Sequence, residues 1–456
     1  MTTQPETGTS HPSRKRPGNP REVLLLAYPV VLTYLSETLM GVVDSAMVGR
    51  LGATELGAVG FGAIWMWTIF ALLYGTASGV QIFVSQTDGA GQSRSCGAWA
   101  WQGLYALVPS ALVFVALLLV AAKPLLALLG PSPELSALAA EYIQTRVAGE
   151  FAYVVLMVLT AFFHGTGDTR TPLYVTIFAN AVNLVLDYGL IFGHFGLPAW
   201  GVAGAGTATS VAAWSASAVL FTLFRRRSLS ERFDTSPKKP NPSQIWRFVR
   251  TGAPVGGQWC IGTSSFAVFA TVVARMGDTS MAASQAFNML LSLSYMQAVG
   301  IGTASSTLVG RYVGANDPRA AIQCFRSALM LGLAVALTIA LLFVAIPVPL
   351  LRIFSNDLAV IELGRPLLLL GAVFVVFDAV AIVSEGSLRG GGDTRWPFLL
   401  EAVLGWGLLI PLAYYLGVVL EGGVRGAWTG ALIHMSVLSS ALFWRFRSNA
   451  WQRIRI

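Results

Sequence analysis

Long apolar runs, interrupted by short clusters of glycine, proline and charged residues, divide this chain of 456 residues. Each run has about the 20 mostly apolar residues that a helix needs to cross a bilayer. The pattern therefore predicts twelve transmembrane helices, six in each half of the chain. The first six are expected at 22–46, 54–80, 94–122, 136–163, 171–194 and 200–224, and the second six at 244–273, 278–306, 320–345, 357–386, 396–419 and 423–446.

The two halves of the chain repeat one another. The turn Gly165–Pro172 reads GTGDTRTP, and Gly390–Pro397 reads GGGDTRWP 225 residues later. The same shift carries Pro29 onto Pro254. A steady shift indicates a duplicated unit, and six helices per unit make both copies enter the membrane from the same side. We interpret each repeated turn as a helix end followed by a capped helix start, and we expect both prolines to kink their helices.

This pattern predicts an all-α polytopic membrane protein built from two six-helix parallel-repeat lobes. The expected regions are a disordered cytoplasmic tail at 1–20, an N-terminal lobe at 21–224, a cytoplasmic linker at 225–243, a C-terminal lobe at 244–446 and a cytoplasmic tail at 447–456. The first region is polar and has no apolar core, so it is not a cleavable signal peptide.

Composition and charge support a membrane protein and set its orientation. Hydrophobic residues make up 55% of the chain and charged residues 11%, whereas a soluble domain carries about 25% charged residues. Of the 30 Lys and Arg residues, 23 fall on the side of the termini and the linker, and 7 on the other side. Basic residues concentrate on the cytoplasmic side of membrane proteins. The net charge of +8 therefore reflects the orientation of the helices in the inner (plasma) membrane. We expect no nucleic-acid partner.

Acidic and amide side chains lie within the predicted helices, where they are costly and usually functional. Glu37 and Asp44 are seven residues apart and share one face of the first helix. Asn180, Asn183 and Asp187 form one stripe on the fifth helix. For Asn180, a hydrogen bond to a neighbouring helix is an equally good explanation.

The second half carries its own acidic residues, at positions that do not match those of the first half. Asp378 and Glu385 repeat the seven-residue interval on the tenth helix. The 225-residue shift places no carboxylate opposite Asp44, Asp187 or Asp378. A purely architectural polar residue would more often recur with its scaffold, so we interpret these residues as functional. Glu401 is explained at least as well by a bond between helices.

At this point the chain resembles a known family of membrane proteins, the multidrug and toxic compound extrusion (MATE) family of cation-coupled efflux transporters. The resemblance rests on Pro29 with Glu37, Asp44–Gly52, Gly165–Asp168, Asn183–Asp187 and Gly386–Gly390, and it extends over about 21–446. It implies two lobes around a central cleft and antiport driven by Na⁺ or protons, with no cofactor.

The resemblance also implies a cation site in the N-terminal lobe, formed by Asp44, Asn183, Asp187 and Thr209, with Thr207 as the alternative to Thr209. Carboxylate, amide and hydroxyl oxygens are hard ligands that suit Na⁺ or a proton. Two carboxylates close together in a low dielectric repel one another, and a bound Na⁺ or proton relieves that repulsion. Sequence does not separate the two ions.

Four further residues are expected in the substrate cleft: Glu37, Gln258, Asp378 and Glu385. Several members of the family carry an acid where this chain has Gln258, a departure that argues against a second cation site. An acidic, aromatic-rich cleft favours amphipathic organic cations as substrates. We expect the partners of the protein to be small organic substrates and the lipid bilayer, and we expect the protein to be a monomer.

Other functional classes fit less well. The chain has no zinc motif of the His-Glu-x-x-His type and no nucleophile motif, so we expect no enzymatic activity. A flippase for lipid-linked sugars, or an exporter of organic-acid metabolites, is the alternative on the same scaffold, because fold alone does not fix the substrate.

Overall fold

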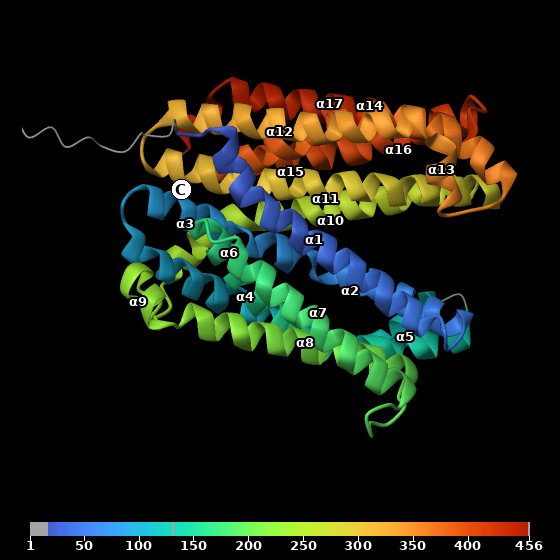
Figure 1. Ribbon diagram of the computed structural model, residues 1–456, viewed down its shortest axis with the longest axis horizontal. Helices are drawn as coiled ribbons and strands as arrows, with labels where there is room; N and C mark the ends of the chain where they lie inside the picture. The colour runs from blue at the N-terminus through green and yellow to red at the C-terminus, as the bar shows by residue number, and fades with distance from the viewer. Residues whose placement is uncertain (1–16, 130–131, 455–456) are drawn as a thin grey trace, which may run out of the picture.

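The computed structural model of the chain describes residues 17–129 and 132–454, and its regular structure in these ranges is entirely helical (Figure 1). The N-terminal half contains α1 (Pro20–Val48), α2 (Ala53–Ala77), α3 (Gly79–Gly89), α4 (Cys96–Leu129), α5 (Pro133–Arg146), α6 (Glu150–Thr166), α7 (Arg170–Phe192) and α8 (Gly201–Phe224). A short helix, α9 (Arg227–Phe233), follows.

The C-terminal half repeats the order of the spans but divides them into helices differently. It contains α10 (Pro242–Ala274), α11 (Asp278–Gly314), α12 (Pro318–Ala345), α13 (Pro347–Arg352), α14 (Leu358–Gly390), α15 (Arg395–Leu404), α16 (Ile410–Tyr414) and α17 (Gly423–Arg447). Two π-helical stretches, Gly405–Leu409 and Tyr415–Val419, flank α16 within the eleventh span. Pro411 lies in this region and removes a backbone donor from the helical ladder.

The twelve predicted spans are confirmed. In the described residues, eleven helical stretches are long and apolar enough to cross a membrane. The remaining predicted span is α11, the eighth in chain order, which contacts α14, α12, α1 and α3 and carries many small polar side chains on its buried face. On the outside of the protein large apolar side chains are exposed, among them Val120, Leu39 and Leu341. Such a surface suits lipid rather than water.

The helices form two lobes with separate cores. The first core packs α2–α6, α8 and the start of α10, for example with Phe162 edge-to-face on Phe224. Two further cores, one at each end of the second lobe, hold α10–α17 together. Helix α1 joins both lobes, because Val23 and Ala27 pack into the second lobe while its C-terminal half contacts α7.

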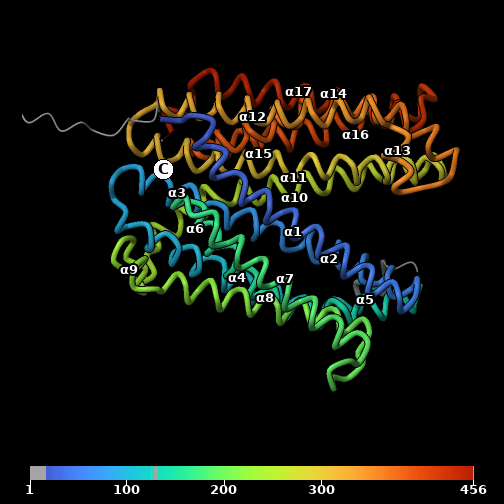
Figure 2. The backbone as a smooth tube through the Cα atoms, in the orientation of Figure 1, coloured from blue at the N-terminus to red at the C-terminus, as the bar shows by residue number. Residues whose placement is uncertain are grey.

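The two lobes meet at one end of the molecule. Figures 1 and 2 show the helices of the two lobes converging near α3 and α6 and diverging toward α5 and α13. At the contact, helices α2 and α10 touch through glycines: a Cβ on Gly75 would lie only 2.6 Å from Gly256 Cα. Likewise, a Cβ on Gly89 would lie 1.9 Å from the carbonyl oxygen of Arg311. Glycine is required where two backbones approach this closely.

The fourth span differs from the single helix predicted at 136–163. Helix α5 ends at Arg146, a 3₁₀ turn occupies Val147–Gly149, and α6 begins at Glu150. Arg146, which was counted on the outer side, lies inside this span. Its side chain is 2.7 Å from Glu150, and this pairing compensates the charge within the membrane.

The segment predicted as a linker is tied to the first lobe. Trp101 of α4 donates its indole N–H to Thr235 O at 3.1 Å, and the Tyr105 hydroxyl donates to Lys238 O at 2.7 Å. Lys238 in turn donates a hydrogen bond to Asp234, which lowers the pKa of that carboxyl below its usual range. The linker therefore lies at the end of the molecule where the two lobes meet, which we call the closed end.

The repeated turns are not equivalent in three dimensions. Asp168 accepts a hydrogen bond from Thr171 N at 3.1 Å, the cap that the sequence indicates. Asp393 instead accepts from Arg445 Nε of α17 at 2.8 Å and is buried. Beyond α17, the segment expected as a tail turns back as far as it is described, and Trp451 stacks on the buried ring of Phe446.

Candidate functional site

Three of the four residues expected to form the cation site lie together between α1 and α7. Asn183 Nδ2 donates to Asp44 Oδ1 at 3.3 Å and also to Asp187. Asp187 has an exposed fraction of 0%. One amide therefore bridges two carboxyls inside the first lobe.

The local sequence explains this geometry. Asn183 and Asp187 are one helical turn apart on α7, so both point at the same face of α1. Asn180, one turn earlier, donates to the Ser36 hydroxyl at 2.7 Å and to Ser36 O at 3.0 Å. Asn180 thus fastens α7 to α1, which is the alternative explanation that the sequence left open.

The threonines of α8 do not bond to this cluster. The Thr209 hydroxyl donates to Ala205 O at 2.9 Å, and the Thr207 hydroxyl donates to Ala203 O at 2.7 Å. Both bonds stay within α8, a common arrangement for helical threonine. Their hydroxyl lone pairs are not used in these bonds, so either oxygen keeps acceptor capacity.

The cluster has the features of a monovalent cation or proton site. Within residues 17–129 and 132–454, Asp187 Oδ1 is buried and has no hydrogen-bond partner. A buried acceptor of this kind costs free energy unless something pairs with it. The oxygen ligands in the cluster are the two carboxylates, toward which Asn183 turns its amide N–H group, and hard oxygen ligands of this kind fit Na⁺ or a proton.

The residues expected in the substrate cleft are only partly brought together. Glu385 pairs with Arg389 one turn away on α14, and Arg389 Nη2 donates to Gln258 Oε1 of α10 at 3.1 Å. Asp378 is buried two turns before Glu385. Glu37 lies on α1, in electrostatic range of Tyr153 of α6. Arg389 was missed as a site residue, although it stands in the motif Gly386–Gly390.

Polar bonds also join the lobes where they converge. Arg311 of α11 donates to Thr166 O at 2.9 Å and lies 3.4 Å from Asp88 of α3. Gln81 Nε2 donates to the Thr307 hydroxyl at 2.9 Å, and Gln86 Nε2 donates to Gly390 O at 2.9 Å. We call these bonds the interlobe latch: Gln81, Gln86, Asp88 and Thr166 of the first lobe with Thr307, Arg311 and Gly390 of the second.

A second charged group in the first lobe was also missed. Arg146 and Glu150 pair at the break between α5 and α6, and the Tyr74 hydroxyl donates to Glu150. Their spacing of four residues inside an apolar run was the available signal, because a helix places such residues side by side. The break contains Gly149 but no proline, and it depends on contacts from α8.

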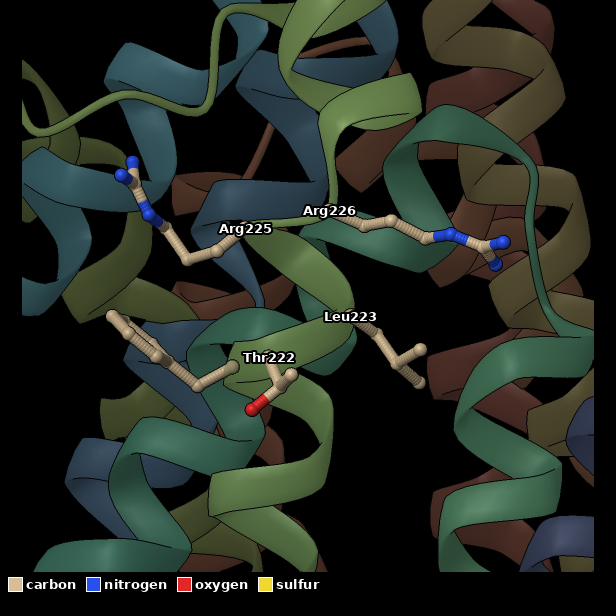
Figure 3. A pocket seen from close by; sticks show the side chains of 5 residues that line it. Thr222, Leu223, Arg225 and Arg226 are labelled. Atoms are coloured by element: carbon tan, nitrogen blue, oxygen red, sulfur yellow. The ribbon is translucent and has the colours of Figure 1, made fainter.

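The pocket in Figure 3 lies elsewhere. Phe221, Thr222, Leu223, Arg225 and Arg226 line it, at the end of α8 where the linker begins. None of the expected site residues takes part, and the two arginine side chains in the view extend away from one another. This position at the end of a span suits basic side chains at lipid headgroups.

Comparison with known proteins agrees with this architecture. The MatE family model matches residues 29–189 and 254–415. A Thermotoga maritima protein named "Probable multidrug resistance protein NorM" is 28% identical over 449 residues, which cover 97% of this chain and 95% of that protein. The multidrug resistance protein NorM of Burkholderia vietnamiensis is 30% identical over 427 residues, 92% of each chain.

A solved structure shares the fold. A multidrug resistance MATE family transporter in an outward-facing conformation superposes with a TM-score of 0.88. The alignment covers 96% of this chain and 98% of that one, at 21% sequence identity. At this identity the likeness concerns the arrangement of the helices.

Proposed function

Because this chain belongs to the MATE family of transporters, we propose that it exports amphipathic organic cations across the inner membrane by antiport against H⁺ or Na⁺. Multidrug resistance proteins of the same family are similar to this chain over more than nine-tenths of its length. They support drug efflux as its general function. The site in the first lobe supports cation coupling.

The observation that carries the proposal is the carboxyl pair of the half-buried Asp44 and the fully buried Asp187, with Asn183 between them. When both carboxyls are ionised, their repulsion in a low-dielectric interior is large. Uptake of one H⁺ or Na⁺ removes most of that repulsion, so the loaded and empty states of the lobe differ in free energy. A ligand that changes this energy between two conformations shifts the population between them.

The interlobe latch supports an alternating-access cycle. It closes the end that carries the linker and both repeated turns, and the distribution of basic residues assigns that end to the cytoplasm. In this arrangement the chain opens to the outside. Opening to the cytoplasm requires the Arg311 and Gln81 bonds across the lobes to break.

Acidic residues favour cationic substrates. We assign the three carboxyls of Glu37, Asp378 and Glu385 and the amide of Gln258 to the substrate cleft, as the family resemblance implies. Tyr34 of α1, Tyr153 of α6 and Tyr295 of α11 lie in electrostatic range of these carboxyls, and aromatic rings attract organic cations. One of the three carboxyls, Glu385, is already neutralised by Arg389.

Arg389 also supports a second candidate function. Its half-buried guanidinium beside Gln258 offers a donor to carboxylates, so an exporter of organic-acid or lipid-linked metabolites is the alternative on this scaffold. Export assays with the two substrate classes separate these functions, because the protein should export either an organic cation such as ethidium or an organic anion, but not both.

The test is coupled efflux of ethidium in everted vesicles that contain the full chain. Asp44→Asn and Asp187→Asn are nearly isosteric and should each abolish efflux driven by an imposed ΔpH or Na⁺ gradient, while the protein still inserts. Asp168→Asn, a change of the same type in the cap of α7, is the matched control and should keep most of the activity. Equal effects in all three variants would remove the coupling role from the pair.

A further inference from the structure

The end of α8 carries a hollow that takes no part in the proposed transport cycle. Its volume is about 540 Å³, and it is lined by Phe221, Thr222, Leu223, Arg225 and Arg226 (Figure 3). Phe221, Thr222 and both arginines are exposed. Helix α8 runs along the outer edge of the first lobe (Figure 1), so the hollow opens on the outside of the bundle. A ligand reaches it from the membrane or from the adjoining solution.

The hollow combines apolar and cationic groups. In Figure 3 the two arginine side chains extend to opposite sides, and Thr222 lies below them, between the two. The apolar groups come from Phe221 and Leu223, which belong to the last turn of the span, and Arg225 follows directly. Basic side chains at the end of a transmembrane helix lie at the level of the lipid head groups. This arrangement fits an amphiphile with a negative head group and apolar chains.

The positive charge of the segment 225–239 is only partly neutralised. Its two acidic residues are already paired, because Arg227 lies 2.8 Å from Glu231 and Lys238 pairs with Asp234. Within residues 17–129 and 132–454, the other four basic side chains of the segment form no ion pair: Arg225, Arg226, Arg232 and Lys239. Charge complementarity therefore favours an anionic ligand at this place.

Hydrogen bonds hold the segment in place on the first lobe. Arg225 Nη1 donates to Thr235 O at 2.7 Å, and Gln102 Nε2 of α4 donates to Lys239 O at 3.1 Å. The basic groups thus stand on a fixed surface and not on a free linker. A site that is ordered before its ligand arrives loses less conformational entropy on binding.

The second lobe has no equivalent cluster. The 222-residue shift that aligns the start of α8 with the start of α17 carries Phe221 onto Phe443 and Arg225–Arg227 onto Arg447–Asn449. Three consecutive arginines in the first lobe thus correspond to one arginine in the second. The guanidinium of Arg447 lies over the Phe443 ring, 5.7 Å from its centroid. Two of the three positive charges are specific to the first lobe.

We propose that the hollow at the end of α8 binds one anionic phospholipid of the cytoplasmic leaflet. Arg226 donates hydrogen bonds to the lipid phosphate, and Arg225 adds a second positive charge beside it. Phe221 and Leu223 contact the upper part of the acyl chains. The lipid fastens the junction of α8 and the linker to the membrane, on the first lobe alone. This site is separate from the proposed coupling site and from the substrate cleft.

The test is native mass spectrometry of the full chain in a neutral detergent, which resolves individual bound lipids. The probes are phosphatidylglycerol, which is anionic, and phosphatidylcholine with the same acyl chains, which carries no net charge. A basic side chain close to anionic lipid contributes about fivefold to affinity. The first phosphatidylglycerol should therefore bind at least about fivefold more tightly than the first phosphatidylcholine. Arg226→Gln should lower the affinity for phosphatidylglycerol about fivefold and leave that for phosphatidylcholine unchanged.

Arg447→Gln is the matched control, because Arg447 is exposed at the equivalent end of the second lobe. It should leave the binding of the first phosphatidylglycerol unchanged. Equal affinities of the two lipids for the unaltered protein would overturn the inference. An equal loss in Arg226→Gln and Arg447→Gln would also overturn it, because binding would then follow the total charge and not this hollow.

Glycerol 3-phosphate separates a lipid site from a site for free phosphate. It carries the charged phosphate of the head group but no acyl chains. At millimolar concentration it should not displace the bound phosphatidylglycerol, because the contacts of the chains with Phe221 and Leu223 are missing. Displacement at that concentration would overturn the assignment of the site to a lipid.

Discussion

The contact between Gly75 and Gly256 offers a direct way to disturb the closed end. Replacing Gly75 by alanine would place a Cβ 2.6 Å from Gly256 Cα and 3.0 Å from Val255 O. Both neighbours are backbone atoms, so no side chain can rotate away, and α2 and α10 must separate. Gly60 lies on the same helix, and a Cβ added there would have no heavy atom within 4 Å, which makes Gly60→Ala a matched control.

The size of the effect follows from packing. An extra methyl group in a close-packed contact typically costs about 1–3 kcal/mol. The strain exists only while the lobes are in contact at this end, so it favours the state in which they are apart. A shift of that size changes the ratio of the two states by about 5- to 150-fold. The gain in helix propensity from glycine to alanine is common to Gly75→Ala and Gly60→Ala.

A reporter cysteine measures this shift. Ser85 is fully buried at the lobe contact, facing Gly310, and its hydroxyl donates within α3. In a chain whose three cysteines are replaced by alanine, Ser85→Cys should react slowly with a maleimide in detergent. Adding Gly75→Ala should accelerate the reaction at least about fivefold, as expected from the population shift.

Two results would refute this reasoning. An unchanged rate in a folded Gly75→Ala protein would mean that the contact does not hold the lobes together. An equal acceleration in Gly60→Ala would mean that any added methyl group loosens the protein, so the lobe contact would have no special role.

Three further predictions concern the ends of the protein and its linker. Trp451→Ala should destabilise the detergent-solubilised chain by about 3 kcal/mol, measured by its melting temperature, whereas Trp444→Ala at an exposed position should change it little. Ser228→Cys in the exposed part of α9 should react with an impermeant maleimide in everted vesicles only; labelling from outside would reverse the topology. The Lys238 bond favours the ionised Asp234 carboxyl, so it holds above the ordinary pKa of about 4 and is lost as pH falls through the lowered pKa. Pepsin should therefore cut the linker faster at the lowest pH, and Asp234→Asn should lose that pH dependence.

Much of the architecture could be predicted from local patterns in the sequence. Apolar run lengths predict the twelve spans, and the repeat of the GDTR turn predicts two equivalent halves. The seven-residue and four-residue spacings place Asp44 and the Asn183–Asp187 stripe on single helix faces. These faces meet only because α1 packs against α7. The sequence pattern does not predict that packing, and the expectation that these residues form one site came from the family resemblance.

Features that depend on tertiary contacts could not be predicted in the same way. The break at Val147–Gly149 is stabilised by Ser210 and Trp214, more than 60 residues away in the chain. Asp393 looks like the cap Asp168 in sequence, yet it pairs with Arg445 of α17. In each case the local pattern is compatible with a regular helix or cap, and a distant side chain decides the outcome.

The central claim is that substrate export and cation entry are one reaction carried by the Asp44–Asp187 pair. Proteoliposomes containing the full chain, with an imposed ethidium gradient and no initial ion gradient, test it directly. We predict that ethidium movement drives H⁺ or Na⁺ in the opposite direction, recorded with a pH-sensitive dye or by ²²Na⁺ uptake, and that Asp44→Asn abolishes the ion flux. Ethidium transport without a counter-flow of either cation, or an undiminished ion flux in Asp44→Asn, would contradict the account.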